Sequence, residues 1–263
     1  MSHPRRFLLS ALVTLLGVPA LAAAQADYHH MHLSAPDGAE AAAWYMEHMD
    51  CEDFGREGAC QVGSTQIIWF GNRTDAGPSV GTGVNHIGFS FADLEAKMAA
   101  WQAAGLNIEN PDTPIRDVPG LFKLAFLTDP WGTRIEVVED AEWPGFHHIH
   151  LNSPDPEGTI DWYANVFGGE RDSLKGRIAG LRYGGVWLLA ARADAVDGTT
   201  GRAIDHLGFG FADLDAAAAE MKAKGAAFTM EPRDYTNPLG QRMKISFVTG
   251  PDDVSIEVVQ PVN

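Results

Sequence analysis

Histidine and glutamate recur in two sets whose residue types and spacing could bind a metal ion. The first set is His30, His86 and Glu136, and the second is His148, His206 and Glu257. Both glutamates lie in runs of valine and isoleucine, where burying a carboxylate is costly unless a cation meets it. Two neutral imidazoles and one carboxylate, with other coordination positions open, suit non-haem Fe(II), with Mn(II) close behind. For any single histidine the simpler interpretation is a hydrogen-bonded core residue, but the recurrence of all three favours at least one metal site.

A further histidine follows two positions after the first ligand candidate of each half. Residues two apart on a strand point to the same face, so His32 lies beside His30 and His150 beside His148. Histidine is the residue that most often serves as a general acid or base. We therefore predict that His32 and His150 are the catalytic acid–base residues, with a supporting or core role as the alternative.

The elements that must position these residues are repeated along the chain. Three blocks recur in the same order: YHHMHLSAPD (28–37) as FHHIHLNSPD (146–155), NHIGFSFADL (85–94) as DHLGFGFADL (205–214), and KLAFLTDPWGTRIEVVE (from Lys123) as KISFVTGPDDVSIEVVQ (from Lys244). Recurrence at nearly constant spacing predicts two homologous halves, residues 26–140 and 141–263.

Each half contains two similar units in turn. A strand-like opening with a histidine leads into a helix, and three short β-rich runs follow. Each helix is expected to begin after an aspartate: Asp37, Asp93, Asp155 and Asp213. Gly105 and Gly225 stand where helices should end, because glycine adopts the left-handed cap conformation without steric cost. One such unit cannot cover its own sheet, so we expect the two units of each half to pair around a shared cavity, which gives two half-barrels per chain.

The opening H-x-x-L from His30 and the closing D-P-x-G-x-x-I-E from Asp129 to Glu136 resemble the vicinal oxygen chelate superfamily. That superfamily holds glyoxalase I, extradiol ring-cleaving dioxygenases, fosfomycin resistance proteins and bleomycin-binding proteins. The resemblance covers nearly all of the chain after residue 25. It implies an α+β fold of four βαβββ modules that form two tandem half-barrel domains. It also implies that the metal ligands are the first-strand histidines and the last-strand glutamate, which are His30, His86 and Glu136 in one half and His148, His206 and Glu257 in the other.

Several chemistries occur in that superfamily, and departures from its patterns separate them. Glyoxalase-type isomerases resemble this chain but carry an acidic fourth ligand, which here falls near Ile68 and in the apolar run VWLLA from Val186. Three ligands leave room for a substrate bound through two oxygens and for O₂, so dioxygenase-like chemistry with Fe(II) is favoured. Extradiol enzymes have a tyrosine where Phe126 and Phe247 stand, so the acid–base group would come from elsewhere. The alternatives are a glyoxalase-type isomerase or lyase, which would use Ni(II), Co(II) or Zn(II), and a non-catalytic module that binds a small molecule.

Charge and the N-terminal residues restrict the partners and the compartment. Nineteen Lys and Arg against thirty-five Asp and Glu give a net charge of −16, which argues against nucleic acid and anionic lipid as partners. Arg5 and Arg6, an apolar run and Ala22–Ala24 predict a signal peptide over residues 1–24. The expected product is a periplasmic or secreted protein with a small-molecule substrate and no membrane association after cleavage, although a retained anchor is the alternative and a homodimer is left open.

The two cysteines can be interpreted in the light of export. Cys51 and Cys60 are nine positions apart in a polar stretch that contains glycine. In an oxidising compartment this spacing fits a local disulfide, and two free thiols are the alternative.

Overall fold

The computed structural model describes residues 25–261, which form an α+β fold of four successive modules. The first module comprises β1 (Asp27–Ser34), α1 (Gly38–His48), β2 (Ala59–Val62) and β3 (Thr65–Phe70). The second comprises β4 (Val84–Ser90), α2 (Leu94–Ala103), β5 (Asn107–Ile108), β6 (Arg116–Asp117), β7 (Lys123–Thr128) and β8 (Arg134–Glu139). The third comprises β9 (Gly145–Ser153), α3 (Pro156–Phe167), β10 (Glu170–Leu174), β11 (Ile178–Tyr183) and β12 (Val186–Arg192). The fourth comprises β13 (Ile204–Gly210), α4 (Leu214–Ala223), β14 (Ala227–Thr236), β15 (Arg242–Thr249), the short 3₁₀ turn η1 (Pro251–Asp253) and β16 (Ser255–Pro261).

These elements confirm the predicted fold class, and the predicted signal peptide lies outside the described residues. In the first module the strand expected directly after the helix is reduced to one isolated bridge between Glu52 and Gln61. Among residues 25–261, no helix combines the length and the apolar character needed to cross a membrane.

The predicted aspartates begin all four helices. The carboxylates of Asp37, Asp93, Asp155 and Asp213 each accept a hydrogen bond from a backbone N–H in the first turn. Such caps satisfy donors that have no partner within the helix. Gly105 and Gly225 follow α2 and α4 with φ of 75° and 86°, the left-handed conformation expected there.

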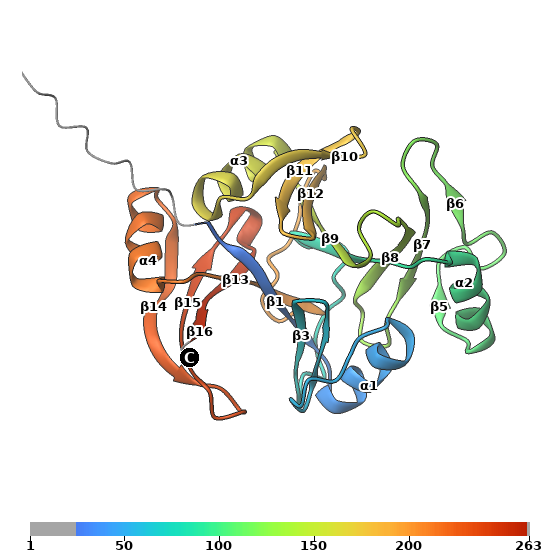
Figure 1. The fold of residues 1–263 in the computed structure, drawn as a ribbon, viewed down its shortest axis with the longest axis horizontal. Coiled ribbons are helices and arrows are strands. Elements are labelled where there is room, and N and C mark those ends of the chain that lie inside the picture. Colours follow the sequence, from blue (N-terminus) through green and yellow to red (C-terminus); the bar gives the residue numbers. More distant parts are fainter. Residues whose placement is uncertain (1–24, 262–263) are drawn as a thin grey trace, which may run out of the picture.

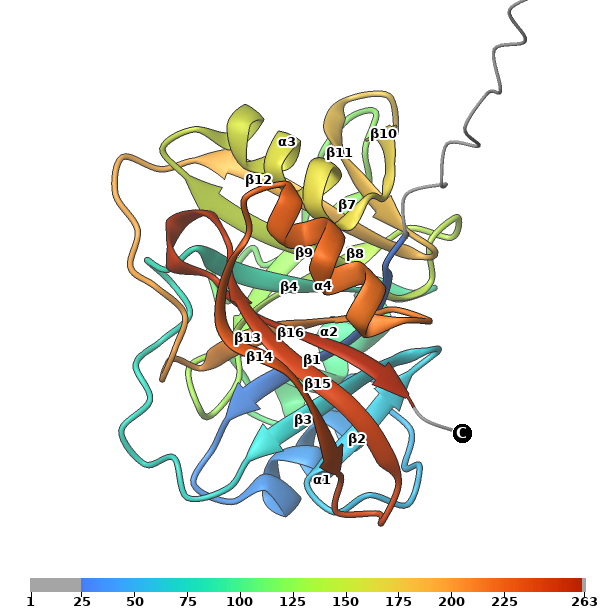
Figure 2. The ribbon, with the colours of Figure 1, turned by 90° about the vertical axis from the view of Figure 1, so that its left-hand side faces the viewer.

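The pairing of modules differs from the sequence-based expectation, which is wrong on this point. One sheet has seven strands in the order β14-β15-β16-β13-β1-β3-β2, so the first module joins the fourth. The other has the main order β10-β11-β12-β9-β4-β8-β7-β5, so the second module joins the third. Figures 1 and 2 show the first strand, in blue, lying beside the orange and red strands of the last module.

Two connecting segments lie side by side where the chain passes from one sheet to the other. The opening strand of each module is an edge that can pair with the opening strand of any other module, so sequence similarity does not choose among partners. The segments that follow β3 and β12 run side by side, with bridges at Gly77–Arg202 and Thr82–Asp197. The Ala203 N–H donates to the Gly77 carbonyl at 2.7 Å. These contacts join the two segments that connect the sheets.

Successive side chains of a strand point alternately to the hydrophobic core and to the inner face of the sheet. On β16, Ile256 and Val258 belong to the main hydrophobic core, whereas Glu257 and Val259 line a cavity. We call the inner face of the seven-stranded sheet, which carries His30 and Glu257, the first cup. The inner face of the nine-stranded sheet, which carries His148 and Glu136, is the second cup.

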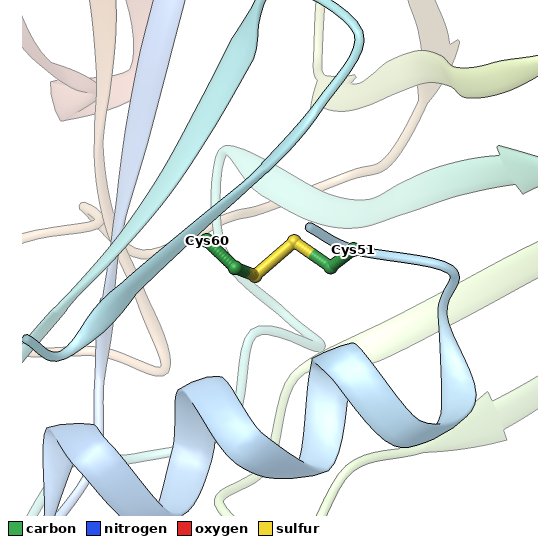
Figure 3. Close-up of a disulfide and its surroundings, with 2 residues drawn as sticks. All are labelled: Cys51 and Cys60. Carbon is green, nitrogen blue, oxygen red and sulfur yellow. A yellow bond between two sulfur atoms is a disulfide. The ribbon is translucent and has the colours of Figure 1, made fainter. Parts of the chain in front are cut away.

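A disulfide closes the segment between α1 and β2. Cys51 and Cys60 are bonded with an S–S distance of 2.02 Å, which confirms the predicted bridge. Figure 3 shows the bond joining the chain just after α1 to β2. The closed segment, residues 51–60, lies beside the first cup.

Candidate functional site

Each cup brings together four residues that could bind a metal ion. The first cup has His30 and His32 from β1, His206 from β13 and Glu257 from β16. The second has His148 and His150 from β9, His86 from β4 and Glu136 from β8. Within each group, one potential ligand atom per residue lies within 4.8 Å of the others.

All six predicted ligand candidates fall in these two groups, but the predicted grouping is wrong. His86 and Glu136 lie with His148 rather than with His30, because the modules exchange partners. Each group therefore draws residues from both halves of the sequence.

In the first cup, two imidazoles converge on one carboxylate oxygen. The Nε2 atoms of His30 and His206 lie 3.0 and 3.2 Å from Glu257 Oε2. Burial alone would raise the pKa of Glu257, but the hydrogen bonds from His206 and His30 outweigh it and hold the pKa far below its usual value. Burial lowers the pKa of His30. The carboxylate is thus ionised, and His30 stays neutral near neutral pH.

The second cup repeats this geometry. His86 Nε2 lies 2.9 Å and His148 Nε2 3.3 Å from Glu136 Oε2. Burial lowers the pKa of His86 to about 4 and that of His150 to about 3. Neutral imidazoles around an ionised carboxylate are the protonation states in which these side chains bind a metal.

Side chains behind the imidazoles fix their orientation. His206 Nδ1 donates to Asp205 Oδ1 at 2.8 Å, and His86 Nδ1 donates to Asn85 Oδ1 at 2.9 Å. This leaves Nε2 of each ring directed at the carboxylate, an arrangement usual for metal-binding histidines. Burial lowers the pKa of His206, but the hydrogen bonds to Asp205 and Glu257 raise it above the usual value.

Two glycines make room for the other imidazoles. A Cβ placed on Gly208 would lie 2.2 Å from the His30 ring, and one on Gly88 would lie 2.1 Å from the His148 ring. Each glycine pairs with that histidine across the central strands of its sheet. Sequence reasoning missed both glycines and Asp205, although the matching signatures NHIG and DHLG contain them.

The donors fit a divalent metal. The buried His32 Nδ1 has no hydrogen-bond partner, and the buried His148 Nε2 has only the 3.3 Å contact with Glu136 Oε2. A buried polar atom of this kind is costly unless something binds it. Three histidines and one glutamate are ligands that suit iron, manganese, nickel or zinc rather than calcium or magnesium. A divalent metal at each group is therefore consistent with the residues present.

The first cup opens into a large cavity. Its volume is about 1150 Å³, and His30, His32, His206 and Glu257 lie in its wall. Gln66, Ile68 and Phe70 of β3 line one side of it, and Ile245 and Phe247 of β15 line another. A small substrate could therefore reach the four donors.

The equivalent inner surface of the second cup is packed with apolar side chains. Trp187 stands beside His148 as Gln66 stands beside His30, and it is 1% exposed. It packs with Phe122, Leu124, Val138, Leu174 and Leu189, and Trp143 covers this cluster. On another side the Arg134 guanidinium lies 3.8 Å from the Phe126 ring and pairs with Glu109. The second cup thus has far less room for a substrate.

The fold and these groups define a tandem cupped-sheet protein whose two inner faces each hold a histidine–glutamate cluster. The family model of the Glyoxalase/Bleomycin resistance protein/Dioxygenase superfamily matches residues 27–137 and 145–258. The chain belongs to this superfamily, as its motifs predict.

Solved structures show the same fold. Glyoxalase I from Zea mays superposes with a TM-score of 0.69 at 18% identity, over 90% of this chain and 92% of that one. A candidate dioxygenase from Bacillus subtilis gives 0.62 at 15% identity, over 92% and 87%. A search of curated proteins finds no match. At these identities the structures establish the shared fold and leave the reaction open.

Proposed function

We propose that the chain is a divalent-metal-dependent enzyme whose reactive centre is the first cup. The observation that carries this proposal is the cavity of about 1150 Å³ that opens onto His30, His32, His206 and Glu257. A divalent metal held there would act as a Lewis acid toward a small substrate that chelates it through two oxygens. Fe(II) is the favoured metal, and Mn(II), Zn(II) and Ni(II) are the alternatives.

The residues of this cup have separate roles in the proposal. His30, His206 and Glu257 bind the metal, and Asp205 holds His206 with Nε2 facing inward. His32 lies with its ring 4.5 Å from the His206 ring, and burial lowers its pKa well below the usual value. It is therefore neutral, and its unpartnered Nδ1 can accept a proton from the substrate.

Dioxygenase-like chemistry is the reaction class that these residues favour. Ile68 stands on β3 in register with His32, at the place where an isomerase of this fold would need a second carboxylate. The described wall of the cavity contains only two acids, Glu57 and Glu257. The isomerase alternative lacks an evident second carboxylate ligand.

The second cup has a structural role in this proposal. Its cluster joins β4, β8 and β9 at the centre of the nine-stranded sheet. A metal there would crosslink the second and third modules, with Trp187 and Arg134 limiting access. His150 then acts as a supporting residue in that cup rather than as a catalyst.

The N-terminal sequence and the Cys51–Cys60 bridge support export to the periplasm or secretion. The proposed partner is a small molecule. N-terminal sequencing of the protein recovered from outside the cytoplasm should begin at Gln25, and a chain beginning at Met1 in the cytoplasm would contradict export.

Paired variants test the reactive centre. Protein purified without affinity metal is analysed by elemental mass spectrometry, and O₂ consumption is followed with a panel of catechols. His206→Ala should lose one metal equivalent and all O₂ uptake. The matched His86→Ala should lose the other equivalent and keep most of the uptake. Equal loss of activity in both variants would overturn the first cup as the reactive centre. Turnover without O₂ would overturn the proposed reaction class.

His32→Gln tests the acid–base role. The expected result is an unchanged metal content with a loss of turnover of about 10²- to 10⁴-fold. Loss of metal comparable to that of His206→Ala would show that His32 is a ligand and would refute the acid–base assignment.

A further inference from the structure

The disulfide-closed segment 51–60 places an arginine in the wall of the first cup. Arg56 and Phe54 both line the cavity, whereas Cys51 and Cys60 anchor the two ends of the segment. The Asp53 carboxylate accepts a hydrogen bond from the Gly55 N–H at 2.8 Å, and Gly55 has φ of 85°. The segment is thus a short, crosslinked loop that places Arg56 in the wall of the cup.

The Arg56 guanidinium has no ion-pair or hydrogen-bond partner among the described side chains, although it is half-buried. In a chain with thirty-five acids and nineteen basic residues, a cation without a carboxylate partner is unexpected. Glu257, which lies in the same cavity, is already bonded to His30 and His206. Burial lowers the pKa of Arg56, so holding its charge there costs free energy that an incoming anion would recover.

The second cup provides an internal comparison. The β2–β3 and β11–β12 hairpins align in register, with Ala59 opposite Ile68 and Gly180 opposite Leu189. Three residues before these positions lie Arg56 and Arg177, which makes Arg177 the nearest counterpart of Arg56 in the second cup. The Arg177 guanidinium donates to the Pro119 carbonyl. Arg177 of the second cup therefore has a hydrogen-bond acceptor, whereas Arg56 of the first cup has none among the described residues.

A second arginine without an ion-pair partner among the described residues lies in the wall of the same cavity. Arg242, at the start of β15, also lines the cavity and forms no ion pair among residues 25–261. Glu57 is the one acid of the wall besides Glu257, and it is exposed. The wall of the first cup therefore holds two arginines without an ion-pair partner among the described residues, in a strongly acidic protein.

We infer that the substrate of the first cup carries a carboxylate at the end remote from its metal-chelating oxygens, and that the Arg56 guanidinium binds this carboxylate. The planar guanidinium matches a carboxylate through two parallel hydrogen bonds. This inference rests on the proposed function, since it assumes that the substrate chelates a metal in the first cup. Arg56 is then a specificity-determining residue, and the crosslink between Cys51 and Cys60 restricts its position.

Chelating probes test the inference without any turnover. The protein is loaded with Zn(II), which has no redox chemistry, and titrated in a calorimeter with 4-carboxybenzohydroxamate and with its neutral isostere 4-carbamoylbenzohydroxamate. Both probes have the same two-oxygen chelating group and differ only in the remote substituent. The carboxylate probe should bind about 10- to 100-fold more tightly, the range expected for a charged hydrogen-bonded pair.

Arg56→Gln should remove this preference, and Arg177→Gln is the matched control that should retain it. Arg56→Lys should retain only part of the preference. The positive charge remains, but the ammonium group cannot form the two parallel hydrogen bonds of a guanidinium. Equal melting temperatures of the variants would exclude a folding defect as the cause.

Two failures are distinguishable. Equal affinity of the two probes for the wild-type protein, or an unchanged preference in Arg56→Gln, overturns the inference and leaves metal chelation in place. Binding of neither probe overturns the proposed function itself, and the inference falls with it. Binding that survives His206→Ala would show that the probes occupy another site, and this outcome too would overturn the inference.

Discussion

Gly208→Ala should remove metal from the first cup although no proposed ligand is substituted. The new Cβ would lie 2.2 Å from Cε1 and Nδ1 of His30 and 2.5 Å from its Nε2. Ordinary carbon contacts begin near about 3.5 Å, so the imidazole must move by more than about 1 Å or the strands must separate. Backbone strain is not the cause, because the conformation of Gly208 is accessible to other residues.

The expected loss of metal affinity can be estimated from the role of the displaced His30 ring as a ligand. Changes that only misorient a metal ligand usually lower affinity by about 10- to 100-fold, or about 1.4–2.7 kcal/mol. A ring displaced by this distance should reach at least the upper end of that range. Overpacking adds a stability cost of about 1–3 kcal/mol.

Graded chelator competition followed by elemental analysis measures the effect. Gly88→Ala is the matched control, because its Cβ would meet His148 in the second cup at 2.1 Å. Each variant should lose one metal equivalent, and only Gly208→Ala should lose activity. A folded Gly208→Ala protein that binds both metals with wild-type affinity would refute the assignment of His30 as a ligand.

Three further predictions concern stability and use the differences between equivalent positions. Tyr45 donates to Asp129 at 2.9 Å whereas the buried Tyr163 hydroxyl has no partner, so denaturant titration should show Tyr45→Phe losing about 1.5–3 kcal/mol and Tyr163→Phe almost nothing. Burial raises the pKa of Asp129 to about 6, above its unfolded value, so its contribution is present below pH 4 and is lost between pH 4 and 6. That contribution is about 3 kcal/mol, and the difference between the wild-type and Asp129→Asn pH profiles should show it; a difference independent of pH would contradict it. Removing the Cys51–Cys60 bridge by a double serine substitution should cost about 2.5 kcal/mol at the urea midpoint, and no shift would argue against the disulfide.

Local chemistry made most of the elements predictable from the sequence. The aspartates cap the helices because their carboxylates satisfy free N–H groups, and Gly105 ends α2 because it takes a positive φ at no cost. The run Lys123–Thr128, which opens one of the repeated blocks, forms a strand. These signals depend on neighbours within a few residues, so they do not depend on how the modules pair.

The grouping of the site residues was not predictable in the same way. His30 and His206 are 176 positions apart, and their meeting depends on which opening strands pair. The four opening strands are too similar for pattern reasoning to choose among them. The two crossing segments contact each other partly through backbone hydrogen bonds, which leave no pattern in the sequence.

Exchange of modules gives a physical account of how two similar clusters come to differ. Each cup is built from one module of each half, so neither half determines a complete cup. The first cup joins the disulfide loop of the first module to the β14–β15 edge of the fourth, which supplies Arg242. The second cup joins Arg134 of the second module to Trp187 of the third, and both fill space. The duplicated donors thus lie in similar groups in both places, while the residues around them differ: the first group opens onto a cavity, and the second is packed with apolar side chains.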